Sequence, residues 1–279
     1  MRERVWSWIT CCSFFLLLPY LVTCMINGTE AALLNRKFDI EKCIPLFLSS
    51  QISDDYDKET IRAQAVITRT NLYYELEEKD LLNILGELKR INKDYKLSFV
   101  DKINKIYSYP QKAYEEAVLH TKNVVLKYDN EVKLAPFHLC SAGTTRDGEE
   151  VFRSKDYEYL VSVDSGFDKE SEDYITITYF TEDELSGDIE IEELDQAGYV
   201  LSLLINGKIL EGESFRKGMN LPSSNFSLQK INNQYQIICR GIGHGVGFSQ
   251  YGGNALAERG RDWKEILNIY FPNMEIEEI

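Results

Sequence analysis

The chain has 279 residues, 44% of them hydrophobic, which is enough to bury a core in one large domain or two small ones. Its formal net charge is −14, whereas a protein that binds nucleic acid carries a basic surface. The composition therefore argues against nucleic acid as a partner and against adhesion of a folded domain to anionic lipid.

An uncharged, apolar run occupies residues 6–26 and follows Arg2 and Arg4. About twenty apolar residues cross a bilayer as a helix, and this run is just long enough. Positive charge on its N-terminal side predicts a single-pass protein of the cell membrane, with a cytoplasmic tail over 1–5 and the remainder extracytoplasmic. A cleaved signal peptide and a lipoprotein signal ending at Cys24 are alternatives that the sequence leaves open.

A short tether is expected over 27–38 and one folded domain over 39–279. Apolar residues recur at helical spacing from Lys58 onward, and Asp57 stands where an N-cap is expected. Residues 77–105 are rich in lysine and glutamate with leucines interleaved, which predicts one or two surface helices.

Short apolar runs between turn residues predict strands in the second half of the chain. A helix over 111–121 precedes a hairpin with strands at 123–127 and 133–138. Further strands are predicted at 161–163, 174–179, 189–191, 200–205, 226–228 and 235–239, and helices at 254–260 and 263–270. Helices early and strands late indicate an α+β fold that mixes helices with antiparallel strands.

Three cysteines, Cys43, Cys140 and Cys239, lie outside the apolar run. Their number is odd and they show no paired CxxC spacing, so a disulfide framework is not indicated. One bridge with a free thiol and three buried thiols both remain open.

Residues 241–253 read GIGHGVGFSQYGG, with glycine at every second position from 241 to 247. Glycine reaches backbone conformations closed to other residues and lets the main chain approach a ligand. The loop also carries His244, Ser249, Gln250 and Tyr251, a set suited to hydrogen-bonding and stacking on a sugar. The spacings of phosphate-binding glycine loops are absent, and a tight structural turn is the other interpretation.

Two further segments accompany this loop, and the three together resemble one family. Residues 60–72, TIRAQAVITRTNL, are similar to a family helix ALKAQAVAARTYAL, and we call them the first motif. The second motif, 137–152, FHLCSAGTTRDGEEVF, is similar to FHSxSGGxTRDAEEVW, and the third, 241–253, to GxGHGVGMSQYGA. In this order, over about 42 to the C-terminus, they resemble the stage II sporulation protein D (SpoIID/LytB) family.

The resemblance implies a membrane-anchored lytic transglycosylase acting on peptidoglycan glycan strands, preferentially strands stripped of peptides, in a groove of the α+β domain. It also implies a role in engulfment during sporulation, with other sporulation cell-wall proteins as partners. One carboxylic acid would protonate the glycosidic oxygen and then take the proton of the attacking 6-hydroxyl. No cofactor is expected. Some relatives bind zinc, but here only His138 and Cys140 stand at suggestive positions, so no metal is expected either.

The resemblance places the family's catalytic glutamate at Gln51, counted back without a gap from the Ala63-Gln64-Ala65 of the first motif. A carboxamide has nearly the shape of a carboxylic acid, but it cannot release and regain a proton at ordinary pH. Two interpretations follow: a transglycosylase with weakened or relocated acid chemistry, for which Asp54 and Asp55 are nearby, and a non-catalytic peptidoglycan-binding or scaffolding pseudoenzyme.

Further site residues come from the motif positions that match the family. Arg69 is expected to point into the groove and hold the substrate near Gln51, with a solvated helix charge as the alternative. The opposite wall and the loop would supply the remaining contacts, through Ser141, Thr145, Arg146, His244, Ser249, Gln250 and Tyr251. For the loop residues, internal hydrogen bonding and packing are the alternatives to sugar contact.

Overall fold

The computed structural model describes residues 40–78, 111–185 and 187–279. The membrane anchor predicted at 6–26 and the tether predicted at 27–38 lie outside these residues. So does the segment predicted as surface helices over 77–105, apart from residues 77 and 78, which end a longer helix. No helix among the residues described is both long enough and apolar enough to cross a membrane.

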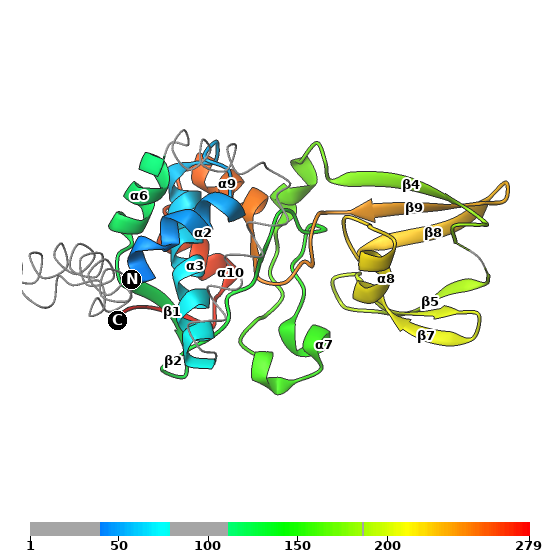
Figure 1. Ribbon diagram of the computed structural model, residues 1–279, viewed down its shortest axis with the longest axis horizontal. Coiled ribbons are helices and arrows are strands. Elements are labelled where there is room, and N and C mark those ends of the chain that lie inside the picture. The colour runs from blue at the N-terminus through cyan, green and yellow to red at the C-terminus, as the bar shows by residue number, and fades with distance from the viewer. Residues whose placement is uncertain (1–39, 79–110, 186) are drawn as a thin grey trace, which may run out of the picture. The chain divides into compact units, whose positions relative to one another are not determined.

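Two compact units make up the chain, Met1–Cys43 and Ile44–Ile279. The described part of the first unit is a short 3-10 helix, η2 (Ile40–Lys42). All other described elements belong to the second unit (Figure 1).

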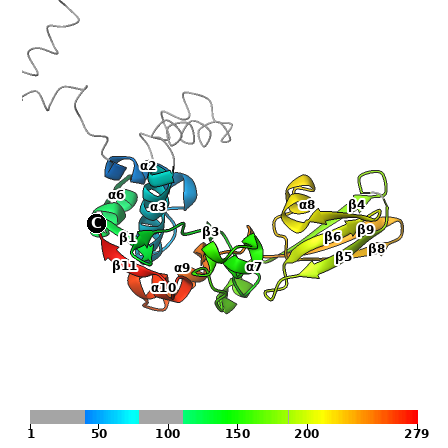
Figure 2. The same ribbon diagram turned by 90° about the horizontal axis from the view of Figure 1, so that it is seen from below.

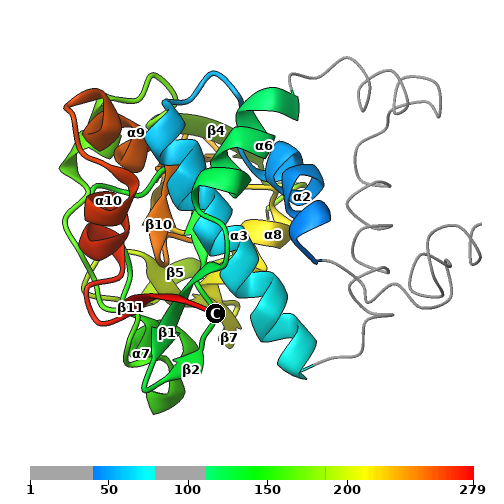
Figure 3. The same cartoon turned by 90° about the vertical axis from the view of Figure 1, so that its left-hand side faces the viewer.

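Within the second unit, α3 (Lys58–Glu78) lies at the centre of a group of helices (Figure 3). The Asp57 side chain accepts a hydrogen bond of 2.8 Å from the Glu59 N–H, which confirms the predicted N-cap. The elements that α3 contacts include α2 (Ile44–Gln51), α6 (Gln111–His120), α9 (Gln250–Glu258), α10 (Trp263–Tyr270) and β1 (Val124–Tyr128). The first motif is thus at the middle of the helical part.

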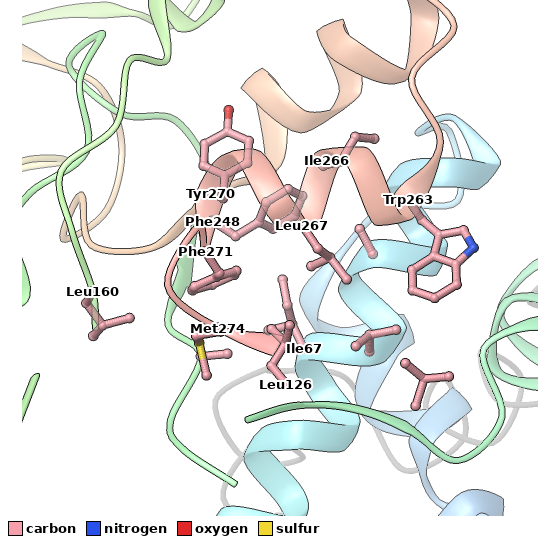
Figure 4. Packing of buried hydrophobic residues seen from close by; sticks show 14 of the residues in the cluster. Ile67, Leu126, Leu160, Phe248, Trp263, Ile266, Leu267, Tyr270, Phe271 and Met274 are labelled. Atoms are coloured by element: carbon pink, nitrogen blue, oxygen red, sulfur yellow. The ribbon is translucent and has the colours of Figure 1, made fainter. Parts of the chain in front are cut away.

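Apolar side chains from α3, α10 and β1 meet in a common core (Figure 4). Ile67 of α3, Leu126 of β1 and Leu267 of α10 are all fully or almost fully buried. Burying one such side chain contributes about 1.5–3 kcal/mol. The core therefore fixes the first motif against the C-terminal helices that follow the third motif.

Two small sheets border this core. In one, β1 pairs antiparallel with β11 (Glu275–Glu278) and with the two-residue strand β2 (Glu131–Val132). In the other, β3 (Phe137–His138) pairs in parallel with β10 (Phe248–Ser249). The predicted second hairpin strand, 133–138, is therefore wrong as a single strand. The reason lies in α3, whose Asn71 side chain hydrogen-bonds both the N–H and the carbonyl of Ala135.

Residues 175–240 form two antiparallel three-stranded sheets and one helix (Figure 2). The first sheet has the order β4-β9-β8 and the second β5-β6-β7, with Phe215 of the helix in the core that their strands share. The elements are β4 (Ile175–Thr181), β5 (Ile189–Leu194), β6 (Val200–Ile205), β7 (Lys208–Glu211), α8 (Gly212–Gly218), β8 (Phe226–Ile231) and β9 (Gln234–Arg240). Together with the helices they confirm the mixed α+β class.

Between β3 and β4 the chain forms short helical turns, α7 (Gly148–Phe152), η3 (Lys155–Tyr157) and η4 (Gly166–Glu170). The strand predicted at 161–163 is wrong, since this segment is irregular. Val163 nevertheless accepts a hydrogen bond of 2.9 Å from the Thr145 N–H, so its backbone is partly satisfied without a strand partner.

Candidate functional site

The second and third motifs run side by side. Besides the pairing of β3 with β10, Cys140 and Ile242 exchange two backbone hydrogen bonds of 2.7 and 3.0 Å. Further along, the Arg146 N–H donates to the Gly245 carbonyl at 2.8 Å. Segments far apart in the sequence therefore make one continuous backbone platform.

The alternating glycines of the third motif are required by packing inside the protein. Gly245 has a φ of +78°, and a Cβ there would lie 2.5 Å from a ring carbon of Tyr199. Gly247 has a φ of +72°, and a Cβ there would lie 2.3 Å from the Pro136 carbonyl oxygen. A side chain at either position would meet protein atoms, so the glycines let the loop pass close to its own neighbours.

Three glutamines and one threonine join the first and third motifs to the end of α2. The Gln51 side-chain oxygen accepts from Gln64 Nε2 at 3.2 Å and from Thr68 Oγ1 at 2.6 Å. Gln250 Nε2 donates to the Gln51 carbonyl at 2.9 Å and to Gln64 Oε1 at 3.1 Å. Gln250 is 3% exposed, so its amide serves this internal cluster, the alternative to the sugar contact expected of it.

Asn254 makes a second connection between the same parts of the chain. Its Oδ1 accepts from the Asp57 N–H at 2.7 Å and from Thr60 Oγ1 at 3.3 Å. The turn between α2 and α3 is thus held against α9, directly beside Gln51.

Two half-buried tyrosines lie close to this turn. Burial raises the pKa of Tyr56, and the proximity of Cys140, Asp168 and Tyr251 raises it further. Tyr251 is fixed at its backbone, where its N–H donates to the Leu139 carbonyl at 2.9 Å. Both rings remain partly exposed, as stacking on a sugar requires.

Asp168 is a residue of the candidate site that the sequence did not reveal. Its carboxylate is fully buried in η4 and accepts from the Ser141 N–H and from Ser249 Oγ, both at 2.8 Å. Burial raises the pKa of Asp168, and hydrogen bonds from Ser141, Ser249 and Ser165 oppose that rise. Its hydrogen bonds connect Ser141 of the second motif to Ser249 of the third. Nothing in the sequence around Asp168 signals this role.

The serines and the threonine expected to face a sugar are fully buried. Ser141 and Ser249 bind Asp168, and Ser249 also accepts from the Gly252 N–H at 3.3 Å as the N-cap of α9. Thr145 Oγ1 accepts from the Val163 N–H at 2.9 Å. These side chains hold the motifs together, which corrects the expectation that they contact sugar directly.

Arg69 does not point outward either. It is 0% exposed and donates to the carbonyls of Val118 and Val124, at 3.2 and 3.1 Å, and to Thr121 Oγ1 at 3.3 Å. A guanidinium supplies several donors, and here they serve the Val118 carbonyl in the last turn of α6, the Thr121 hydroxyl after it and the Val124 carbonyl at the start of β1. The expected substrate contact of Arg69 near Gln51 is therefore corrected to a structural role.

Arg146 is buried as well. Its Nε donates to the Asp195 carboxylate at 2.5 Å, and Nη1 lies 3.4 Å from Glu213 Oε1 and 3.3 Å from the His244 carbonyl. Its guanidinium also stacks over the Tyr199 ring, 4.9 Å from the centroid. Arg146 thus clamps the third motif to residues of the strand-rich part, and the expectation that it forms a sugar-facing wall is corrected.

Two histidines face each other beneath the loop, with ring centroids 5.6 Å apart. His244 Nδ1 accepts from the Val246 N–H, while His138 Nδ1 lies 3.1 Å from the Val246 carbonyl and must therefore donate. Burial lowers the pKa of both, for His138 to about 3. His244 braces the loop as a neutral ring, and no group of three or more potential metal ligands occurs among the described residues.

The position of Gln51 decides what this arrangement can do. Gln51 is half-buried at the end of α2 and is held by both the first and the third motif. An amide there can donate and accept hydrogen bonds but cannot move a proton at neutral pH. The site is therefore equipped for binding a polar ligand, and a carboxyl in the same place would be equipped for acid catalysis.

Comparisons with known proteins agree with the motifs. The SpoIID stage II sporulation protein family model matches residues 29–128. Over 264 residues the chain is 27% identical to stage II sporulation protein D of Bacillus subtilis and 25% identical to that of Bacillus amyloliquefaciens. Each match covers 86% of this chain and 74% of the relative. A segment of 50 residues, 18% of this chain, is 42% identical to 7% of the amidase enhancer of Bacillus subtilis.

Proposed function

We propose that this chain, which carries a SpoIID family domain, is a sporulation-related cell-wall protein that binds peptidoglycan glycan strands at the site around Gln51. Two relatives that align over most of the chain are named stage II sporulation protein D. The shorter similarity to a protein named amidase enhancer also supports a cell-wall setting. Glycan strands as the ligand follow from the resemblance of the three motifs.

One observation carries the proposal. Hydrogen bonds join Gln51, which the resemblance places at the position of the family's catalytic acid, to Gln64 of the first motif and Gln250 of the third. On this proposal the surroundings that would serve an acid are present, while the side chain at 51 is an amide. General acid catalysis contributes roughly 10²–10⁴ in rate, so we expect strands to be bound and cleaved far more slowly than by an enzyme with glutamate at this position.

The test is incubation of the full-length chain with peptide-stripped glycan strands, followed by mass spectrometry of 1,6-anhydro ends and a direct binding measurement. We expect the parent chain to bind strands without forming such ends, and Gln51→Glu to form them at least about 100-fold faster. Gln229→Glu, an exposed glutamine on β8, is the matched control and should behave as the parent. Absence of strand binding in both the parent and Gln51→Glu would contradict the proposal.

A second candidate is an active transglycosylase in which Asp54 supplies the proton. Asp54 is half-buried in the turn after Gln51, whereas Asp55 is exposed and its carboxylate accepts from Ser53 Oγ at 3.2 Å. In that case the parent chain forms anhydro ends, Asp54→Asn abolishes them and Asp55→Asn does not. Cleavage by the parent that survives both substitutions would disprove the account of the missing acid.

We also propose that residues 6–26 anchor the protein in the cell membrane and that other sporulation cell-wall proteins are its partners. The protein should then stay in the membrane fraction after alkaline carbonate extraction, and deletion of 6–26 should release it. Crosslinking in sporulating cells tests the partners, and a set of crosslinked proteins without any cell-wall protein would contradict that part.

A further inference from the structure

We propose that Gln64 and Gln250 are positioning residues that hold the Gln51 amide in one orientation, with its oxygen inward and its nitrogen toward the ligand. The consequence for glycan binding rests on the proposed function, but the orientation itself does not. Gln64 belongs to the first motif and Gln250 to the third, so the proposal gives a physical role to one glutamine of each motif.

The orientation starts from a backbone carbonyl, which can only accept a hydrogen bond. The Gln250 side-chain atom that lies 2.9 Å from the Gln51 carbonyl oxygen must therefore be its nitrogen. The same nitrogen lies 3.1 Å from a side-chain atom of Gln64. That atom must be the oxygen, because two amide nitrogens facing each other would leave a buried donor without an acceptor.

The remaining nitrogen and oxygen assignments follow from one hydrogen-bonded side-chain amide to the next. The other terminal atom of Gln64 is its nitrogen, and it lies 3.2 Å from a side-chain atom of Gln51, which must be the oxygen. Thr68 Oγ1 lies 2.6 Å from this atom and 2.8 Å from the Gln64 carbonyl oxygen, and because a hydroxyl has one proton and can also accept, this contact fits either orientation of the Gln51 amide. Gln64 and Gln250 are 0% and 3% exposed, so water cannot replace a mismatched partner. Each terminal atom of the three amides is thereby identified as nitrogen or oxygen by its hydrogen-bond partners.

The Gln51 nitrogen is left to face away from this cluster. Gln51 is half-buried, and no described residue accepts a hydrogen bond from that nitrogen. The site therefore offers a hydrogen-bond donor, which fits an acceptor oxygen of a sugar: a hydroxyl, an acetamido carbonyl or a glycosidic oxygen. With glutamate at 51, the inner oxygen would accept from Gln64, and the outer oxygen would carry the catalytic proton.

Side-chain amide exchange tests the orientation in the full-length chain labelled with ¹⁵N-glutamine. Each signal is assigned by its loss in the corresponding Gln→Met variant. We expect the Gln51 amide protons to exchange with water at least about tenfold faster than those of Gln64 and Gln250, which are buried and hydrogen-bonded. Equal protection of all three amides would overturn the proposal.

Gln64→Glu tests the direction of the hydrogen bonds rather than their presence. A carboxylate at 64 still accepts from Gln250 but can no longer donate to Gln51, so the Gln51 amide should turn its nitrogen inward. We expect exchange of the Gln51 amide to slow, whereas Gln229→Glu should leave it unchanged. An unchanged Gln51 amide in folded Gln64→Glu would overturn the proposal. If that variant does not fold, Gln250→Met removes the anchoring donor and should also slow Gln51 exchange.

A second measurement uses the carboxyl introduced by Gln51→Glu. Its pKa, followed by carboxyl ¹³C NMR, should rise when Gln64→Met is added, because the N–H that stabilises the charged form is lost. An unchanged pKa would overturn the positioning role. Neither measurement needs glycan. If strand binding fails while the exchange rates and the pKa shift are as expected, only the proposed function is refuted. If strands bind but the exchange rates or the pKa shift differ from those expected, only the positioning role is refuted.

Discussion

Arg69 shows that the chemistry of a residue does not reveal which way its side chain points. Its place in the first motif resembles that of a substrate-facing arginine, yet its donors are used by the carbonyls of Val118, in the last turn of α6, and Val124, the first residue of β1. A helix end leaves its last carbonyls without intrahelical partners, and Arg69 supplies a donor to the carbonyl of Val118 in the last turn of α6. This need arises from the tertiary packing of α6 on α3, so no pattern in residues 60–72 could have revealed it.

Arg69→Met should lower the free energy of unfolding by on the order of 3 kcal/mol, because the buried carbonyls of Val118 and Val124 would lose a donor. Urea denaturation of the full-length chain measures this. Arg153→Met is the control, since the Arg153 side chain is 70% exposed, and it should change stability by less than about 0.5 kcal/mol. Normal stability with lost glycan binding would restore the substrate-contact interpretation.

Elements that depend on local sequence were predictable. The start of α3, the bounds of α10 and the end of α9 before Gly260 follow from periodicity, caps and a glycine with φ of +88°. Elements that depend on distant partners were not. Strand β3 pairs with β10 rather than completing a hairpin, and Asn71 of α3 occupies the backbone groups that a longer strand would have used.

The third motif behaves as one packed element, and Gly245→Ala tests this. The added Cβ would lie 2.5 Å from the ring of buried Tyr199, whose hydroxyl is held by the Ala142 N–H at 2.8 Å. Gly207→Ala is the matched control, with a φ of +76° and no heavy atom within 4 Å of the new Cβ. Both variants suffer backbone strain, and Gly245→Ala should be less stable than Gly207→Ala by about 1–3 kcal/mol in urea denaturation. Equal stabilities would show that the loop can move away from Tyr199.

For the molecule as a whole, the site exists only because the fold joins segments distant in sequence. Gln51 of α2 and Gln250 of α9 meet because both helices pack on α3, and Asp168 joins the second motif to the third. The three motifs led to the family resemblance, and the resemblance led to the amide at 51. It could not separate side chains that face a ligand from side chains that hold the motifs in place, because that distinction depends on burial.

The free energy of unfolding should fall on acidification, and protonation of His138 should account for part of the loss. The folded protein keeps this ring neutral, with a pKa of about 3, whereas the unfolded chain has the ordinary value of about 6.5. Between these values the unfolded state binds the extra proton, so stability present above pH 6.5 is lost progressively toward pH 3. One pKa unit corresponds to 1.36 kcal/mol, so His138 should account for a loss of about 2 kcal/mol between pH 7.5 and 5.

His138→Asn isolates this contribution, because an asparagine Nδ2 can still donate to the Val246 carbonyl and does not titrate. The free energy of unfolding in urea should therefore decline less steeply with acid in the variant than in the parent, by about 2 kcal/mol at pH 5. His244, whose pKa burial also lowers, and Asp168, whose raised pKa acts in the opposite sense, titrate in both proteins and cancel in the comparison. If the free energies of unfolding of the parent and the variant fell in parallel with acid, the His138 ring would be protonated in the folded protein. The assignment of His138 and His244 as neutral rings would then be wrong.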